Sequence, residues 1–577
     1  MAPISVRSHR CLAAFAAAAV VALLAACDKP AAPTASGASP APAEKPTATT
    51  DATVAAAGPG AANGTAGAHA DAGIAWHEAA NDAEVDAAFA TARSENKPVF
   101  VYWGAKWCPP CNQVKATLFN RQDFIERSRA FVPVYVDGDS PGAQKIGARF
   151  KVSGYPTMVL FNPQGKEVTR LPGEVDPSRY TEVLTLGMNA SRPVGAVLAD
   201  ALARPAALEP NDWRLLAFYS WETDQQQVVA KDKLPATMLA LANGCPASAP
   251  EAAMRLRLKA LAFADEKKPP RVDASTRTAV VALLGDPVRT REQTDMVTNY
   301  ASEIVRTTSV KGTPERKALV AAFDGALKRL EADTTLSRAD RMQALIAQVD
   351  LARVDEPAAG EPTTAHVRPK PAPQLPAALV ADVRDQVARA DREITNGYER
   401  QAVITAAAYL LERAGLGDES DALLKANLAK SHSPYYLMSE LASNAKKRGD
   451  TAEALHWYRE AYDKSEGPAT RLQWGASYIV ALIELAPRDE KAIEAATAQL
   501  WSEAATQPDA FYMRSARSLQ RVGEKLQAWN KGGAHRAAMA RLDTRLADLC
   551  AQPARSGDER ATCEKLLGSH GKPATQA

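Results

Sequence analysis

The sequence predicts an α/β domain over residues 74–190, a large all-α region over residues 195–570 and a disordered N-terminal tether. Three observations lead to this division. The runs KPVFVYWG and FVPVYVDGD are rich in β-branched and aromatic residues, as buried strands are. Beyond residue 195 this pattern gives way to Ala/Leu-rich stretches with helical spacing. Ahead of the domain, the chain consists almost wholly of Ala, Pro, Thr, Gly and Ser, which cannot bury a core.

Residues 1–26 predict a secretory signal. Arg7 and Arg10 supply positive charge, and the apolar run LAAFAAAAVVALLAA is too short and too Ala-rich for a membrane span. The run ends in LAAC, which resembles the lipobox of bacterial lipoproteins, where the chain is cut before a cysteine that carries the lipids. The resemblance implies that Cys27 is lipidated. An ordinary signal peptide with an incidental cysteine is the alternative.

Residues 27–73 predict a flexible tether, since they hold no aromatic residue and only one large aliphatic one, Val54. Acyl chains on Cys27 would anchor the chain, because each buried CH₂ contributes about 0.8 kcal/mol. The next residue, Asp28, resembles the inner-membrane retention signal of enteric bacteria. We therefore expect a periplasmic protein that is lipid-anchored to the cell envelope, at the inner membrane.

The net charge excludes one class of partner. The chain has 69 Lys and Arg against 67 Asp and Glu, and loss of the signal segment leaves 67 of each. A neutral mature chain lacks the basic surface that nucleic-acid binding usually needs. We expect no nucleic-acid partner, and we expect no cofactor.

Cys108 and Cys111 lie at a predicted strand-to-helix junction. KPVFVYWG precedes the pair, and NQVKATLFNRQDFIERS follows it with Val114, Leu118 and Phe119 at helical spacing. Unpaired N–H groups at a helix N-terminus stabilise a thiolate, so Cys108 is placed as a nucleophile. Cys111, one turn later, is close enough to attack a mixed disulfide. The spacing therefore indicates a redox pair.

A zinc clip is the first alternative for this pair. Structural zinc takes four ligands, commonly two CxxC pairs or one CxxC with two spaced histidines. This chain has one CxxC, and its eight histidines are scattered. We expect no metal site.

The residues around the pair resemble the thioredoxin family. WCPPC after a buried strand is similar to that family's active site, and GYPTMVLFNPQGKEVTRLPG is similar to the segment that carries its cis-proline. The lead-in IAWHEAANDAEVDAAFATARSENKP resembles the periplasmic thioredoxin-like branch, which includes a domain of membrane electron-transfer reductases. The resemblance covers residues 74–190 and implies a thioredoxin fold, a central mixed sheet flanked by helices.

The resemblance also implies roles for individual residues. Cys108 would be the exposed attacking thiol and Cys111 the resolving thiol. Pro156 would be cis, and the backbone of Tyr155 would pair with an incoming substrate strand. Trp107 would pack over the disulfide, although a plain core aromatic is the alternative. The implied partners are protein thiols and disulfides and, if the site works reduced, a membrane electron donor.

One departure from the family leaves the direction of electron flow open. Many thioredoxins carry a buried acid six residues before the first cysteine, where it helps to deprotonate the resolving thiol. Tyr102 stands there in this chain. Glu78, Asp137 and Asp139 are acidic residues of the domain, but nothing in the sequence assigns one to this task.

The all-α region divides into residues 195–355 and 377–570, separated by the Pro-rich linker EPAAGEPTTAHVRPKPAPQLP over residues 356–376. The second half resembles tetratricopeptide repeats, because GDTAEALHWYREAY follows the small–aromatic–small pattern of their second helices. An array of plain helical hairpins is the alternative. The residues that carry the pattern are Ala454, Tyr458 and Ala461, with a similar upstream set of Ala422, Ala426 and Ala429.

The remaining cysteines predict one further disulfide. Cys11 leaves with the signal, and disulfides persist in a periplasmic compartment. Cys550 and Cys563 flank a segment that holds Pro553, where the chain can turn back. A structural disulfide there would contribute about 3 kcal/mol in the chain-entropy model. Cys245 then remains as a free thiol.

Two function classes follow from these observations. The first is a membrane-tethered periplasmic thiol–disulfide oxidoreductase, whose helical region selects protein substrates or dimerises the molecule. The second is a tetratricopeptide-like scaffold whose α/β domain only binds partners. The intact Cys108–Cys111 pair together with Pro156 favours the enzyme, because a pure binding module could lose either cysteine freely.

Overall fold

The computed structural model describes residues 73–152, 154–171, 177–190, 192–266, 273–356, 374–555 and 557–568. The predicted signal segment, the lipidation site Cys27 and the tether up to residue 72 lie outside these residues. Most of the predicted Pro-rich linker lies outside them as well.

The α/β domain is built on a mixed sheet of five strands in the order β1-β3-β2-β4-β5. The first three strands in that order are parallel, and β4 and β5 run antiparallel to their neighbours. The predicted runs KPVFVYWG and FVPVYVDGD form the central strands β2 and β3, as expected. The strands are β1 (His77–Glu78), β2 (Val99–Gly104), β3 (Val132–Asp137), β4 (Thr157–Phe161) and β5 (Glu167–Leu171).

Helices cover both faces of this sheet. Successive side chains of β2 point to opposite faces, so that Val101 joins one core and Phe100 the other. On the first face lie α2 (Asp82–Glu95), which buries Val85, Ala88, Phe89 and Ala92, and α5 (Ala143–Arg149). The elements on the second face are α3 (Pro109–Val114), a π-helical turn (Lys115–Phe119), α4 (Gln122–Ser128) and α6 (Pro177–Met188).

The rest of the described chain is helical. Its helices are α7 (Val194–Ala203), α8 (Pro210–Phe218), α9 (Leu234–Gly244), α10 (Pro250–Ala262), α11 (Ala274–Gly285), α12 (Pro287–Glu292), α13 (Thr294–Asn299), α14 (Ala301–Thr308), α15 (Pro314–Ala332), α16 (Arg338–Ala352), α17 (Ala377–Glu393), α18 (Gly397–Arg413), α19 (Gly417–Asn427), α20 (Pro434–Arg448), α21 (Thr451–Lys464), α22 (Pro468–Leu485), α23 (Glu490–Ala505), α24 (Met513–Trp529), α25 (Arg536–Cys550) and α26 (Gly557–Gly568). Among the described residues, no helix is both long enough and apolar enough to cross a membrane.

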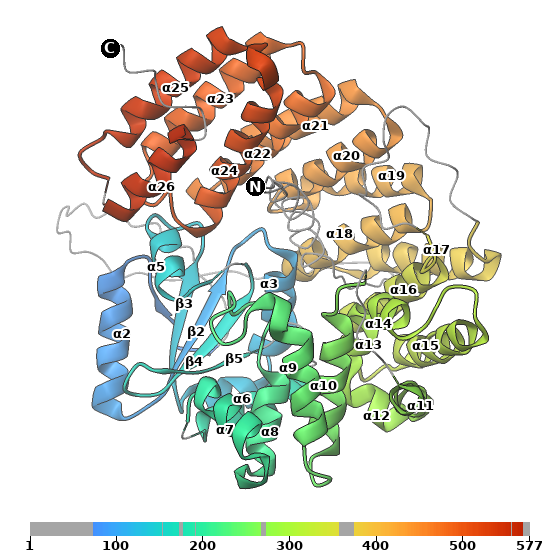
Figure 1. Ribbon diagram of the computed structural model, residues 1–577. Helices are drawn as coiled ribbons and strands as arrows, with labels where there is room; N and C mark the ends of the chain where they lie inside the picture. The colour runs from blue at the N-terminus through green and yellow to red at the C-terminus, as the bar shows by residue number, and fades with distance from the viewer. Residues whose placement is uncertain are drawn as a thin grey trace, which may run out of the picture.

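The helical region follows a curve that begins and ends at the α/β domain. In Figure 1 the green helices lie below the sheet, the yellow ones to its right and the red C-terminal ones above it. Along this curve α8 packs on α6, α18 packs on α3, and α24 packs on α5. The second face of the sheet and the C-terminal helices consequently share one continuous hydrophobic core.

The alanines predicted to carry the repeat pattern are buried in one part of the second half and exposed in another, so the tetratricopeptide assignment stays a prediction. In α21, Ala454 and Ala461 are buried, as the pattern requires. In α19, the buried positions are Leu423, Leu424 and Asn427 instead. The larger leucine side chains bury more apolar surface than alanines, so they determine which side of α19 faces the core. The alanines placed in the pattern are exposed, namely Ala422 and Ala426 in α19 and Ala429 just after it.

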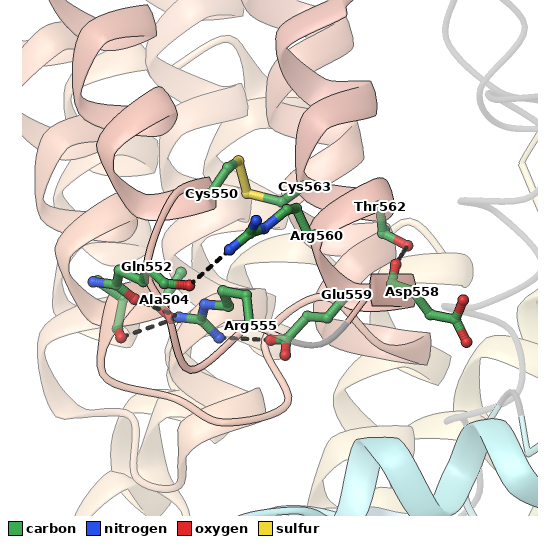
Figure 2. The surroundings of a disulfide bond; sticks show 10 residues. Ala504, Cys550, Gln552, Arg555, Asp558, Glu559, Arg560, Thr562 and Cys563 are labelled. Atoms are coloured by element: carbon green, nitrogen blue, oxygen red, sulfur yellow. Dashed lines mark hydrogen bonds and ion pairs between the residues drawn. A yellow bond between two sulfur atoms is a disulfide. The ribbon is translucent and has the colours of Figure 1, made fainter.

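A disulfide joins the last two helices. Cys550 ends α25, Cys563 lies in α26, and their Cα atoms are 5.6 Å apart. Figure 2 shows the polar network beside the disulfide, in which Arg555 and Glu559 form an ion pair at 2.5 Å. Both side chains of that pair are only 3% exposed.

Candidate active site

Cys108 lies at the N-terminus of α3, directly after β2 and a short turn. Its sulfur accepts a hydrogen bond from the backbone N–H of Cys111 at 3.3 Å. Pro109 and Pro110 occupy the first helical turn, where their missing N–H groups cost no hydrogen bond. The two cysteines are joined as a disulfide, with their Cα atoms 5.2 Å apart. The backbone therefore holds the first sulfur where a helix N-terminus stabilises negative charge.

The expectation that Cys108 is exposed is wrong in this structure. Cys108 and Cys111 both have 0% of their surface exposed, and Trp107 has 2%. The covering groups come from the helical region, whose residues join the same hydrophobic core as the pair. An isolated α/β domain would lack these helices, which is why reasoning about the domain alone gave an open site.

Trp107 forms the centre of the covered site. Its indole N–H donates to Asp139 Oδ2 at 2.8 Å. The guanidinium of Arg514, from α24, lies 4.4 Å from the centre of its ring, which is cation–π geometry. Three further aromatic rings contact it, with ring centres 5.8 to 6.2 Å away: Tyr155, Tyr436 and Trp474. Trp107 thus packs beside the disulfide, and its other neighbours come largely from the helices α20, α22 and α24.

Asp139 connects this tryptophan to the helical region. Its carboxylate accepts the backbone N–H of Thr470 at 2.9 Å and the Thr470 hydroxyl at 2.6 Å. Gly467, just before α22, makes this approach possible, because a Cβ there would lie 2.8 Å from the Cβ of Asp139. Burial raises the pKa of Asp139, while its bonds to Thr470 and Trp107 act in the opposite direction.

The cis-proline loop lies on the other side of Trp107. The peptide bond between Tyr155 and Pro156 is cis, as the resemblance implies. The Tyr155 hydroxyl accepts a hydrogen bond from Gln144 Nε2 at 2.8 Å, and Arg514 lies over its ring. Gln144 in turn accepts the backbone N–H of Arg514 at 3.0 Å and donates its own to Asp509 at 2.8 Å. The face that would receive a substrate strand is therefore occupied by the chain's own helices.

Acidic groups reach the site from the end of β3 rather than from β2. Tyr102, at the position where many thioredoxins carry an acid, is buried in β2. Asp137 pairs in register with Gly104 at the end of β2, and burial together with the charge of Asp139 raises its pKa to about 6. Glu78 lies exposed on the edge strand β1. Of the three acids noted in the sequence, only Asp137 and Asp139 lie at the strand end that carries the pair.

The helix that carries the pair is also covered by α18. Lys115 is buried, with its ammonium 5.3 Å from the ring centre of Tyr135 and 5.7 Å from that of Tyr398. On the preceding turn, the carbonyl of Lys106 accepts a hydrogen bond from the imidazole of His432 at 3.0 Å. Two sides of the pair are thus enclosed, one by α18 and one by the helices α20 to α24.

Sequence reasoning missed every covering residue in the helical region. Tyr436, Trp474 and Arg514 follow ordinary helical periodicity, and no motif marks them. A left-handed Gly467 and the following helix start are common features of helical hairpins. The sequence holds no sign that links these positions to a tryptophan more than three hundred residues earlier.

Cys245 is the free cysteine of the described chain. It is half-buried, and its thiol donates weakly to the carbonyl of Ala249 at 3.4 Å. Burial raises its pKa to about 11, so it is a thiol rather than a thiolate at neutral pH. Both observations protect this thiol from exchange, and Cys245 is free, as expected.

Comparison with known proteins finds a family match within the α/β domain. A family described as thioredoxin-like domain matches residues 85–187. The thiol:disulfide interchange protein DsbD 1 of Pseudomonas aeruginosa is 29% identical over 113 residues, 19% of this chain and 19% of that relative. Thioredoxin of Mycobacterium bovis is 36% identical over 89 residues, 15% of this chain and 72% of that relative.

Among solved structures, a thioredoxin from Thermus thermophilus is similar at 23% identity with a TM-score of 0.19, covering 24% of this chain and 98% of that one. This chain spans about a fifth of the length of the DsbD relative that it matches.

Proposed function

The chain belongs to the thioredoxin family through residues 85–187, and on this premise we propose that it is a protein thiol–disulfide oxidoreductase whose redox pair is Cys108 and Cys111. One observation carries the proposal: the CxxC pair lies at the N-terminus of α3, with a cis-proline loop on the other side of Trp107. That combination supplies a stabilised thiolate, a resolving thiol and a backbone edge for a substrate strand.

The reduced pair would act in two exchange steps. The Cys108 thiolate attacks one sulfur of a substrate disulfide, so that a mixed disulfide forms and the other substrate sulfur leaves as a thiolate. Cys111 then attacks the Cys108 sulfur, which releases the second substrate thiol and forms the Cys108–Cys111 disulfide seen here. Two electrons pass from the pair to the substrate, and the reverse sequence oxidises a substrate dithiol.

The reduction potential of the Cys108–Cys111 pair tests the proposal and gives the direction of electron flow. The full chain without its lipid anchor is equilibrated in glutathione or dithiothreitol buffers, and the redox state of the Cys108 peptide is read by mass. A potential of about −270 mV would indicate that the protein is a reductant, which needs a membrane electron donor. A potential of about −120 to −180 mV would indicate an oxidant or isomerase. If the two cysteines showed no reversible oxidation and reduction, the proposed enzyme activity would be contradicted.

We further propose that the protein works in the periplasm, held to the inner membrane by lipids on Cys27. The support is the lipobox-like LAAC followed by Asp28 and a tether that lacks core-forming residues. Metabolic labelling with a fatty acid and membrane fractionation test it, with Cys27→Ala as the variant. Loss of the label and release to the soluble periplasm are expected. Unchanged fractionation of the variant would contradict the anchor.

One observation favours the scaffold as a second candidate, namely the complete burial of both sulfurs beneath the helical region. In that case the helical array binds envelope partners and the α/β domain contributes structure only. The double change Cys108→Ser and Cys111→Ser separates the candidates in vivo. Full function without the two thiols would support the scaffold, and loss of function would support the enzyme.

A further inference from the structure

The helical region covers the redox pair with two aromatic side chains and one cationic side chain. Tyr436 stacks on Trp107 with an angle of 19° between the rings, and Trp474 meets it edge-on at 68°. Arg514 lies over both Trp107 and Tyr155, at 4.4 and 5.0 Å from the ring centres. A substrate that paired with the backbone of Tyr155 would have to displace these groups.

We propose that α20, α22 and α24 form a cap over the redox pair, and that residues of this cap decide which disulfides reach Cys108. The inference rests on the proposed exchange activity of the pair. In the closed arrangement no sulfur is exposed, so a substrate reacts only from an arrangement in which the cap has separated from Trp107.

The cap is held by a small number of polar contacts. Asp139 accepts two hydrogen bonds from Thr470, and Gln144 accepts the Arg514 backbone N–H through its side chain and donates its backbone N–H to Asp509. These contacts join the end of the helical curve to the α/β domain without a covalent link. For a substrate to react, the cap must separate at this junction, which breaks these contacts and part of the hydrophobic core that it shares with the α/β domain, while the sheet and the helical hairpins stay folded.

The cap also discriminates by size. A small dithiol needs only enough separation to expose one sulfur beside Trp107. A protein disulfide needs the whole edge of the cis-proline loop, because a substrate strand would lie along Tyr155 where Arg514 now lies. Weakening the cap should therefore increase the reaction with a protein disulfide more than the reaction with dithiothreitol.

Gly467 offers the sharpest variant. Gly467→Ala adds a Cβ 2.8 Å from that of Asp139, and its φ of +86° adds backbone strain. Gly449→Ala is the matched control, because its φ is +81° but its Cβ would meet nothing within 4 Å. Thr470→Val removes one hydrogen bond to Asp139 at nearly constant shape, and it serves if Gly467→Ala fails to fold.

The test uses the full chain in a Cys245→Ser background, reduced and then treated with iodoacetamide, with labelling of Cys108 measured by peptide mass. In the parent chain, labelling should be at least about tenfold slower than in urea, a factor that corresponds to about 1.4 kcal/mol. Gly467→Ala should accelerate it by at least about tenfold and Gly449→Ala by less than about twofold. The acceleration in Thr470→Val should lie between those of the two glycine variants.

Three results would overturn the cap: rapid labelling of the parent chain, no acceleration in both Gly467→Ala and Thr470→Val, or equal acceleration in Gly449→Ala. Insulin reduction by dithiothreitol is measured on the same samples. Acceleration of labelling without insulin reduction in any variant would contradict the proposed activity and leave the cap standing. A rise in insulin reduction no larger than the rise in the reaction with dithiothreitol would overturn the size discrimination.

Discussion

The two disulfides in the described part of the chain are both buried, yet their surroundings differ in kind. Cys108–Cys111 spans three residues at the start of one helix, beneath aromatic side chains of a distant region. Cys550–Cys563 spans 13 residues and joins two neighbouring helices, beside a buried ion pair of the same segment (Figure 2). The first can be uncovered by a movement between regions, while the second is enclosed by its own hairpin.

This difference shows that burial alone does not separate a redox pair from a structural bridge. A short CxxC loop constrains little of the unfolded chain, whereas a longer loop removes more of its entropy. The position at a helix N-terminus gives Cys108 a role that neither sulfur of the second disulfide has, because Cys550 ends its helix. The following changes test the contrast, from the largest expected effect to the smallest.

Serine at Cys108 should give the largest effect on activity. Without the attacking sulfur, insulin reduction by dithiothreitol should fall to the uncatalysed rate, since no mixed disulfide forms. The double change Cys550→Ala and Cys563→Ala should leave the rate per folded molecule within about twofold of the parent. Equal losses in the two variants would remove the distinction between the disulfides.

Arg555→Met should have the largest effect on stability. It removes the ion pair with the buried carboxylate of Glu559 and the hydrogen bonds to the carbonyls of Gln507 and Ala504. Such a change typically costs about 3–5 kcal/mol. Arg541→Met is the control, since Arg541 of α25 is about half exposed in its pair with Glu494 of α23, and this pair should contribute less than about 1 kcal/mol. Calorimetric melting of both variants provides the measurement. Similar melting temperatures would contradict the larger stabilisation expected from the buried ion pair.

Removal of the second disulfide should be somewhat milder. The change of Cys550 and Cys563 to Ala should cost about 3 kcal/mol, because the unfolded chain regains the freedom of a loop of this length. Urea unfolding followed by circular dichroism measures the loss. The same comparison for Cys108→Ala and Cys111→Ala should show a smaller loss, and the reverse order would contradict the assignment of the structural bridge.

The smallest effect concerns protonation beside the redox pair. The pKa of Asp137 is about 6 in the folded chain against 3.8 for an unperturbed Asp, so the folded state binds the proton more tightly. This contribution to stability is fully present below about pH 4 and is lost as the pH rises through about 6. Asp137→Asn should therefore raise the melting temperature more at pH 7 than at pH 4.5. An equal difference at the two pH values would mean that Asp137 does not titrate in this window.

Much of the α/β domain could be predicted from the sequence because its signals are local. β-branched runs gave β2 and β3. The helical spacing of Val114, Leu118 and Phe119 gave the helix that follows the redox pair. The repeat register of α19 was wrong because small residues fit many templates, and the core selected Leu423 and Leu424 instead.

The sequence by itself determined the redox chemistry of this protein, since Cys108, the start of α3 and the cis-proline segment lie within about fifty residues of one another. Only the tertiary structure decided that this chemistry is enclosed. The contact that closes it joins Asp139 to Thr470, which lie 331 residues apart. No local sequence signal, such as periodicity, a helix-capping residue or a turn, extends over that distance. The contact forms because the packing angles between successive helices add up around the curve and bring the last helices back to the α/β domain.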